Sequence, residues 1–316
     1  MPSGNRAVVL KLLFATFFWG GTWIAGRVVV QEMAPLAAAS WRFCIASLIL
    51  GFLVLIREGR PLWSFRDWLF MTALGLSGIF CYNLFFLYGL RLVEAGRGAL
   101  VVAFIPALIA LADWLFFRTP MTSRKASGVC LALLGCLLVV TRGQLLMLIH
   151  GGIGVGEWLL LGCAFTWTAY TLLTRHQSRH FTALAMTFGG CFTGWLMLTA
   201  AALVNGSLFA FEGVTWHGWS SLIFLAVFGT VVAFTWYSDA IKRIGSVRTA
   251  AFINLVPIFA VLQGALLLDE RLGVAVLAGG AIVLFGVFIT NQPQRSENVP
   301  IPESATGQPL HNEGDD

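Results

Sequence analysis

Arg42 is the strongest candidate for a binding residue in this sequence, because it is a cation placed well inside the apolar run Ala34–Ile56. A charged side chain at the centre of a membrane helix costs about 2.5–3.5 kcal/mol on insertion scales, so it needs a partner or a function. A guanidinium offers a planar fork of donors that matches a carboxylate. Arg42 is therefore predicted either to hold an anionic group of a ligand or to pair with a carbonyl or carboxylate of a neighbouring helix.

Aromatic side chains, mainly tryptophans, form a second group of candidate binding residues. Trp19 and Trp23 lie one helical turn apart, and Trp167 and Tyr170 occupy the equivalent run in the second half of the chain. Membrane tryptophans usually concentrate at the two interfaces, whereas Trp19 and Trp167 fall near the middle of their runs. Two interpretations stay open: these rings pack between helices, or they line a cavity.

Four further polar residues lie in matching runs of the two halves: Tyr82, Asn83, Tyr237 and Asn254. Each needs a hydrogen-bond partner when buried, and a neighbouring helix or a substrate would supply it. The predicted substrate-binding set is therefore Trp19, Trp23, Arg42, Tyr82, Asn83, Trp167, Tyr170, Tyr237 and Asn254.

Asp113 is the candidate for coupling transport to protons. It shares one helical stripe with Pro106 and several alanines, which is typical of a surface that packs closely or faces a cavity. A buried carboxylate can have a raised pKa and exchange a proton. The other interpretation places Asp113 at the membrane interface, near the end of its run.

The elements that position these residues are repeated within the chain. Laying residues 95–139 over residues 246–290 without gaps puts Pro106 on Pro257 and aligns two pairs of glycines. These matches keep one register although the two apolar segments are otherwise only loosely similar, which indicates an internal repeat. Proline removes a backbone donor and permits a kink, so Pro106 and Pro257 are predicted to act as a hinge or to shape a cavity.

Composition sets the class of protein. The residues are 58% hydrophobic and 11% charged, against a usual charged share of about a quarter, so an integral membrane protein is predicted. The net charge of +5 comes from basic residues scattered between apolar runs, which predicts no nucleic-acid partner. The six cysteines lack metal-ligand spacing with histidine, and there is no nucleotide-binding loop. No metal, no cofactor and no enzymatic activity are predicted.

Loop charges predict the topology. Basic residues gather on the side of the chain's first residues, whereas the opposite side holds only Arg91, Arg97, Arg142 and Arg271 in its loops. The positive-inside rule then puts both termini in the cytoplasm. The predicted membrane-spanning helices are Val8–Val30, Ala34–Ile56, Trp68–Leu90, Ala95–Phe117, Ser123–Val140, Gly154–Thr174, Ala183–Val204, Gly218–Ala240, Ser246–Leu268 and Leu272–Thr290.

The fold class predicted is therefore an all-α integral membrane protein of ten transmembrane helices. Residues 1–145 form the first five-helix repeat, residues 146–291 the second, and residues 292–316 a disordered cytoplasmic tail. Because five is odd, the second repeat must enter the membrane from the opposite side. Such inverted repeats allow a protein to exchange inward-open and outward-open states about a site near the midplane.

At this point the chain resembles the EamA-type branch of the drug/metabolite transporter superfamily, over about Lys11–Thr290. The residues that carry the resemblance are Trp19-Gly20, Pro35 followed by Arg42-Phe43, and Pro257 with Asp269-Glu270-Arg271-Leu272. One departure is Arg118-Thr119-Pro120, where the first half lacks the matching acidic-basic turn. The resemblance implies a bacterial inner-membrane exporter of amino acids, other metabolites or toxic compounds, with peripheral fifth and tenth helices that could join a homodimer.

The sequence thus predicts a secondary transporter that exports a small-molecule substrate by alternating access in the lipid bilayer. Arg42 would balance an anionic group of the substrate, and the aromatic side chains would receive its apolar part. A membrane-embedded enzyme and a non-transporting receptor or scaffold are the alternatives. The enzyme would need a cluster of catalytic carboxylates, histidines or metal ligands at one interface, which the sequence lacks.

Overall fold

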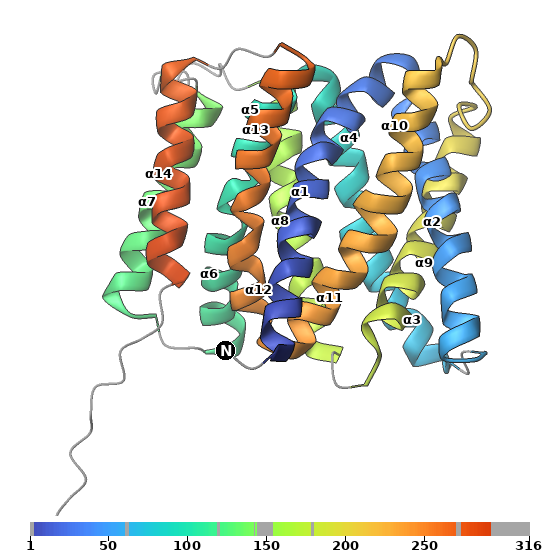
Figure 1. Cartoon of the computed structure of the whole chain (residues 1–316), viewed down its shortest axis with the longest axis horizontal. Coiled ribbons are helices and arrows are strands. Elements are labelled where there is room, and N and C mark those ends of the chain that lie inside the picture. The colour runs from blue at the N-terminus through green and yellow to red at the C-terminus, as the bar shows by residue number, and fades with distance from the viewer. Residues whose placement is uncertain are drawn as a thin grey trace, which may run out of the picture.

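The computed structural model describes residues 3–60, 63–118, 121–141, 143, 154–177, 180–269 and 273–291. Over these ranges the chain is helical and contains no strand, and the helices stand side by side in one bundle (Figure 1). Six helical runs are long and apolar enough to cross a membrane, and two shorter apolar helices accompany them. The prediction of an all-helical membrane protein is confirmed, while the count of ten spans and the inverted repeat stay predictions.

The helices of the first half follow the predicted apolar runs closely. A π-helical turn, η1, interrupts one of them, and a 3₁₀ turn, η2, interrupts another. The elements are α1 (Ser3–Glu32), α2 (Pro35–Arg57), α3 (Phe65–Leu74), η1 (Gly75–Cys81), α4 (Tyr82–Leu92), α5 (Ala95–Val101), η2 (Val102–Phe104), α6 (Ile105–Phe117) and α7 (Ser123–Val140).

The second half is built in the same way, with one π-helical turn, η4, inside its third long run. The first described residue of α1 and the last of α14 lie at the same end of the bundle (Figure 1). The elements are α8 (Val155–Gln177), α9 (Ala183–Val204), α10 (Trp216–Ala226), η4 (Val227–Val232), α11 (Ala233–Ile244), α12 (Ser246–Ile253), α13 (Leu255–Leu267) and α14 (Val274–Asn291).

The two π-helical turns occupy matching places. The register that aligns Pro106 with Pro257 also aligns Gly78 in η1 with Gly229 in η4. Both glycines permit a close approach, because a side chain at Gly78 would clash with the ring of Tyr170 and one at Gly229 with the methyl group of Thr22. Inserted π turns are frequent at functional sites, since they re-aim the residues around them.

Pro106 and Pro257 each lie just after an interruption of a helix. Pro106 is the second residue of α6, directly after the 3₁₀ turn η2, and Pro257 is the third residue of α13, directly after the break between α12 and α13. Proline lacks an N–H and is tolerated in the first turn of a helix, where that donor has no partner. Their role in gating stays a prediction.

Helices α7 and α14 pack against each other at one edge of the bundle (Figure 1). Their glycines bring the two backbones together: a Cβ added at Gly135 would lie 2.6 Å from the Val283 amide nitrogen, and one at Gly286 would lie 2.5 Å from the Ala132 amide nitrogen. The small residues are thus used within a single chain, as expected for close helix packing. Association of two copies through these helices stays a prediction.

Candidate functional site

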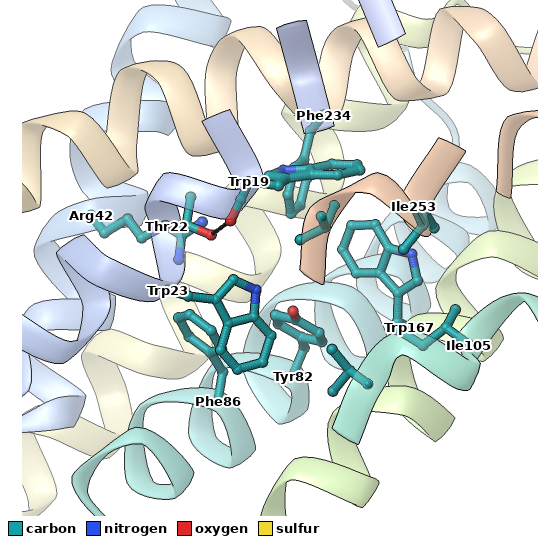
Figure 2. Close-up of a pocket in the computed structure, with 12 residues that line it drawn as sticks. Trp19, Thr22, Trp23, Arg42, Tyr82, Phe86, Ile105, Trp167, Phe234 and Ile253 are labelled. Carbon is teal, nitrogen blue, oxygen red and sulfur yellow. Dashed lines mark hydrogen bonds between the residues drawn. The ribbon is translucent and has the colours of Figure 1, made fainter. Parts of the chain in front are cut away.

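A cavity of about 490 Å³, its mouth included, lies between the two halves of the chain. Figure 2 shows Arg42 and Thr22 at one side of it, and Trp167, Ile105 and Ile253 at the other. The peripheral helices α7 and α14 contribute none of its lining residues. The cavity is lined by Trp19, Thr22, Trp23, Arg42, Tyr82, Phe86, Val102, Ile105, Trp167, Phe234, Ile253 and Val256.

The guanidinium of Arg42 is held by one residue from each half. Its side chain is buried, with 4% of the residue exposed. Nε donates to Thr230 Oγ1 at 3.0 Å, and Nη1 donates to Asn83 Oδ1 at 3.2 Å. Thr230 belongs to η4 and Asn83 follows η1. The two π-helical turns therefore converge on this one cation.

Both partners of Arg42 are themselves fixed as acceptors. Asn83 Nδ2 donates to the Ile79 carbonyl at 2.7 Å, which turns its Oδ1 toward Arg42. Thr230 Oγ1 donates to the Leu225 carbonyl at 2.9 Å, five residues back, which is the spacing of a π turn. Its single hydrogen is thereby used, so the oxygen can accept from Arg42. The guanidinium is oriented before any ligand arrives.

The charge of Arg42 has no neutralising partner in the described part of the chain, where no carboxylate lies within 4.0 Å of its guanidinium. The guanidinium carbon sits 5.0 Å from the centre of the Phe43 ring, a cation–π contact that stabilises the cation without neutralising it. A buried cation in this situation favours an anion that enters the cavity.

Aromatic rings make up most of the remaining wall. Trp19 and Trp167 meet edge to face with ring centres 5.3 Å apart, and both rings contact Phe234. Trp23 meets Phe86 at 4.9 Å in the same edge-to-face manner. Flat aromatic faces around a cavity suit an apolar or aromatic ligand group.

The structure brings five of the nine predicted substrate-binding residues to the cavity wall, namely Trp19, Trp23, Arg42, Tyr82 and Trp167. The other four do not line it. Asn83 holds Arg42 from behind, and Tyr170 and Tyr237 are fully buried against Trp167. Asn254 lies at the break between α12 and α13, where its buried Oδ1 has no hydrogen-bond partner among the described residues.

Two predicted residues fall outside what the structure describes. The backbone of Asp113 belongs to α6, but its side chain is not part of the described structure. Glu270, in the motif that carries the family resemblance, also lies outside the described residues. The coupling role of Asp113 therefore stays a prediction.

Sequence reasoning missed two polar groups and several apolar ones. Thr22 could have been found, because it lies on the cavity side of the helix that carries Trp19 and Trp23. Thr230 gave no signal, since its contact with Arg42 depends on a π turn that hydropathy does not reveal. The other missed wall residues are Phe86, Val102, Ile105, Phe234, Ile253 and Val256.

The structure corrects the prediction that Arg97 lies in a loop. It lies inside α5, and its Nη2 forms a buried ion pair with Glu157 Oε1 of α8. The neighbouring Gly98 packs against Trp23. A carboxylate on the facing helix allows this arginine to be buried, and the pair joins the two halves next to the cavity.

With this geometry in place, the comparisons with known proteins decide the family. A model of the EamA-like transporter family matches residues 6–141 and matches again over residues 154–292. The chain belongs to the EamA-like transporter family. It is a multi-pass membrane protein of the drug/metabolite transporter superfamily.

Relatives of this EamA-like protein include uncharacterized transporters, and their names state no substrate. The uncharacterized transporter YyaM of Bacillus subtilis (strain 168) is 27% identical over 286 residues, which cover 89% of this chain and 92% of the relative. A WAT1-related chloroplastic protein of Arabidopsis thaliana is 25% identical, over 93% of this chain and 72% of its own length. One solved crystal structure matches with a TM-score of 0.63 at 19% identity, covering 90% of this chain and 96% of that one. That likeness shows the fold.

The contact between Arg42 and Thr230 yields a testable prediction. Thr230→Val keeps the shape of the side chain and removes the oxygen that accepts from Nε, leaving a buried donor unpaired. We expect a loss of about 1–3 kcal/mol in the free energy of unfolding, measured as a lower thermal midpoint of the purified protein in detergent. Thr235→Val is the matched control, because its hydroxyl donates to the Val231 carbonyl four residues back and, among the described residues, to no side chain of another helix. Equal midpoints for the two variants would contradict the role given to Thr230.

Proposed function

We propose that this chain is a secondary transporter that exports a small metabolite bearing an anionic group. The observation that carries the proposal is the buried guanidinium of Arg42, which faces a cavity between the two halves and has no described carboxylate partner. The aromatic wall would receive the apolar part of the substrate. The sequence predicts amino acids or toxic compounds as the cargo, and the proposal keeps the wider class of small metabolites.

Alternating access is the mechanism we propose for this transport. It is supported by the family model, which matches each half once, and by the matching positions of the two π-helical turns. Trp19 and Trp167, which occupy equivalent places in the two halves, touch each other at the cavity. Equivalent residues that meet in this way are expected where two repeats share a pseudo-two-fold axis. The predicted repeats, residues 1–145 and 146–291, are the two moving units of this proposal.

The location proposed is a bacterial inner membrane, with both termini in the cytoplasm. The excess of basic residues on the side of the first residues supports this orientation. The start of α1 and the end of α14 lie at one end of the bundle, which fits an even number of crossings (Figure 1). The direction of export rests on the family resemblance.

Counterflow in proteoliposomes tests the proposed function. Vesicles loaded with unlabelled compound should accumulate its radiolabelled form, in a panel of amino acids and small organic acids, above the level of protein-free vesicles. Arg42→Ala should reduce this flux to background while the protein elutes like the wild type in size exclusion. Arg91→Ala, which removes an exposed arginine, is the control and should retain the flux. Absence of flux for the whole panel with folded wild-type protein would contradict the transporter proposal.

A further inference from the structure

We propose that the cavity selects a singly charged anion with a flat apolar body and discriminates against zwitterions such as α-amino acids. This inference deepens the proposed function and rests on it. It follows from the charge of the wall, from the acceptors available there and from the position of Arg42 relative to the apolar surface.

The charge of the wall favours a monoanion. Arg42 is the charged member of the lining set, and none of the described acidic side chains belongs to it. A bound monoanion makes the closed cavity neutral, whereas a zwitterion leaves it with the uncompensated charge of Arg42. In an apolar bundle the neutral combination is the more stable one, because an unpaired buried charge is strongly penalised.

The wall presents the side-chain hydroxyls of Thr22 and Tyr82 as neutral acceptors, whereas an ammonium group brings three N–H donors. The carbonyl of Gly229 already accepts from Trp19 Nε1 at 3.0 Å, and the carbonyl of Trp19 accepts from Thr22 Oγ1 at 2.6 Å. Aromatic faces attract cations, but the ammonium of an α-amino acid is two bonds from its carboxyl carbon. A carboxylate bound to Arg42 would therefore hold the ammonium beside the guanidinium, where the like charges repel each other.

The position of Arg42 sets the shape of the ligand. Arg42 and Thr22 lie at one side of the cavity, and Trp167, Ile105 and Ile253 lie at the other (Figure 2). A ligand that puts its carboxylate on Arg42 therefore directs its body toward aromatic and branched aliphatic side chains. This arrangement suits an aryl-alkyl or similar flat monocarboxylate.

Three probes built on the same phenylethyl unit test this assignment: 3-phenylpropanoate is an anion, L-phenylalanine a zwitterion and 2-phenylethylamine a cation. Binding to the purified full-length protein is followed by the fluorescence of the tryptophans in the wall, and flux by counterflow in proteoliposomes. We expect 3-phenylpropanoate to bind at least about tenfold more tightly than phenylalanine, and 2-phenylethylamine not to compete. Arg42→Gln should abolish the preference, and Arg42→Lys should retain it in weakened form. Arg91→Gln is the control and should bind like the wild type.

The outcomes separate this inference from the proposed function. Phenylalanine binding as tightly as 3-phenylpropanoate, or no binding of the anion to folded wild-type protein, would overturn the substrate class. Counterflow of a zwitterion with no response to the anion would overturn the class and leave the transporter standing. Anion binding that depends on Arg42 but is never accompanied by flux would leave the site standing and contradict transport. The comparison of probes needs only the wild type, so a misfolded Arg42 variant does not remove the test.

A second inference is carried by an asymmetry between the two halves. The register that aligns Trp19 with Trp167 also aligns Thr22 with Tyr170. Thr22 packs on Gly229 of η4, and Tyr170 packs on Gly78 of η1. Helix α1 thus meets η4 in the way that α8 meets η1, with each glycine facing the equivalent residue.

The hydrogen bonds of the two tryptophans break this equivalence. Trp19 Nε1 donates to the Gly229 carbonyl at 3.0 Å, whereas the buried Trp167 Nε1 donates to no carbonyl of the described residues, Gly78 included, and has the Tyr237 side chain as its polar neighbour. We infer that this bond alternates during transport: in the opposite state, Trp167 donates to Gly78 and Trp19 leaves Gly229. The inference rests on the proposed alternating access, in which the two halves exchange their conformations.

Phenylalanine substitutions test the alternation, because they keep an aromatic ring and remove the donor. Ile105→Cys is introduced into a protein that lacks its native cysteines. Labelling of this cysteine by a membrane-impermeant maleimide reports the side from which the cavity opens. Trp19→Phe and Trp167→Phe should shift this labelling in opposite directions, each by roughly fivefold, since each removes a hydrogen bond from one state only. Trp41→Phe, which loses a similar bond to the Leu208 carbonyl away from the cavity, should leave the labelling unchanged.

Shifts in the same direction, or unchanged labelling for both variants, would overturn the alternation. If transport by the wild type is measured and the labelling does not move, the alternation fails and the transporter proposal stands. If labelling of the wild type reaches the cavity from one side only and no substrate exchanges, the proposed alternating access itself fails.

Discussion

A guanidinium buried in an apolar bundle without a described counter-charge is the constraint on which the site depends. Arg42 cannot lie there unless polar groups meet it at fixed positions, because an unpaired buried charge is costly. Thr230 and Asn83 supply two acceptors, and each is locked by a further bond to a backbone carbonyl. The cation is stabilised by neutral acceptors, so its charge remains available to a ligand.

This arrangement also accounts for the irregular backbone at the centre of the bundle. Thr230 can reach both Arg42 and the Leu225 carbonyl because η4 is a π turn, and Asn83 lies two residues after the end of η1. The two turns belong to different halves, so Arg42 connects the two halves at the wall of the cavity. The Arg97–Glu157 pair connects them again near Trp23, but there the charges compensate each other. One arginine is therefore paired within the protein, and the other is the one that we propose binds the substrate.

Much of the fold and part of the site could be predicted from the sequence. Hydropathy located the helices, because a membrane span must be apolar over most of its length, and Arg42 stood out for the same reason. The contact of Trp19 with Trp167 could be anticipated from the repeat, but the roles of Thr230 and Asn83 could not, since they depend on a local change of helical register. Arg97 was misplaced in a loop because its partner, Glu157, is far away in the sequence. The prolines were identified, and the interruption that precedes each of them was not.

The central claim is that Arg42 contacts the anionic group of the substrate, and solid-state NMR tests it most directly. The protein is labelled with ¹⁵N-arginine, reconstituted in bilayers and given 3-phenylpropanoate with a ¹³C-labelled carboxylate. Dipolar dephasing then measures the distance from guanidinium nitrogen to carboxylate carbon. The account predicts dephasing that corresponds to direct hydrogen bonding, about 4 Å or less between these nuclei, and its loss in Arg42→Gln. Bound ligand without dephasing, or dephasing that persists in Arg42→Gln, would contradict it.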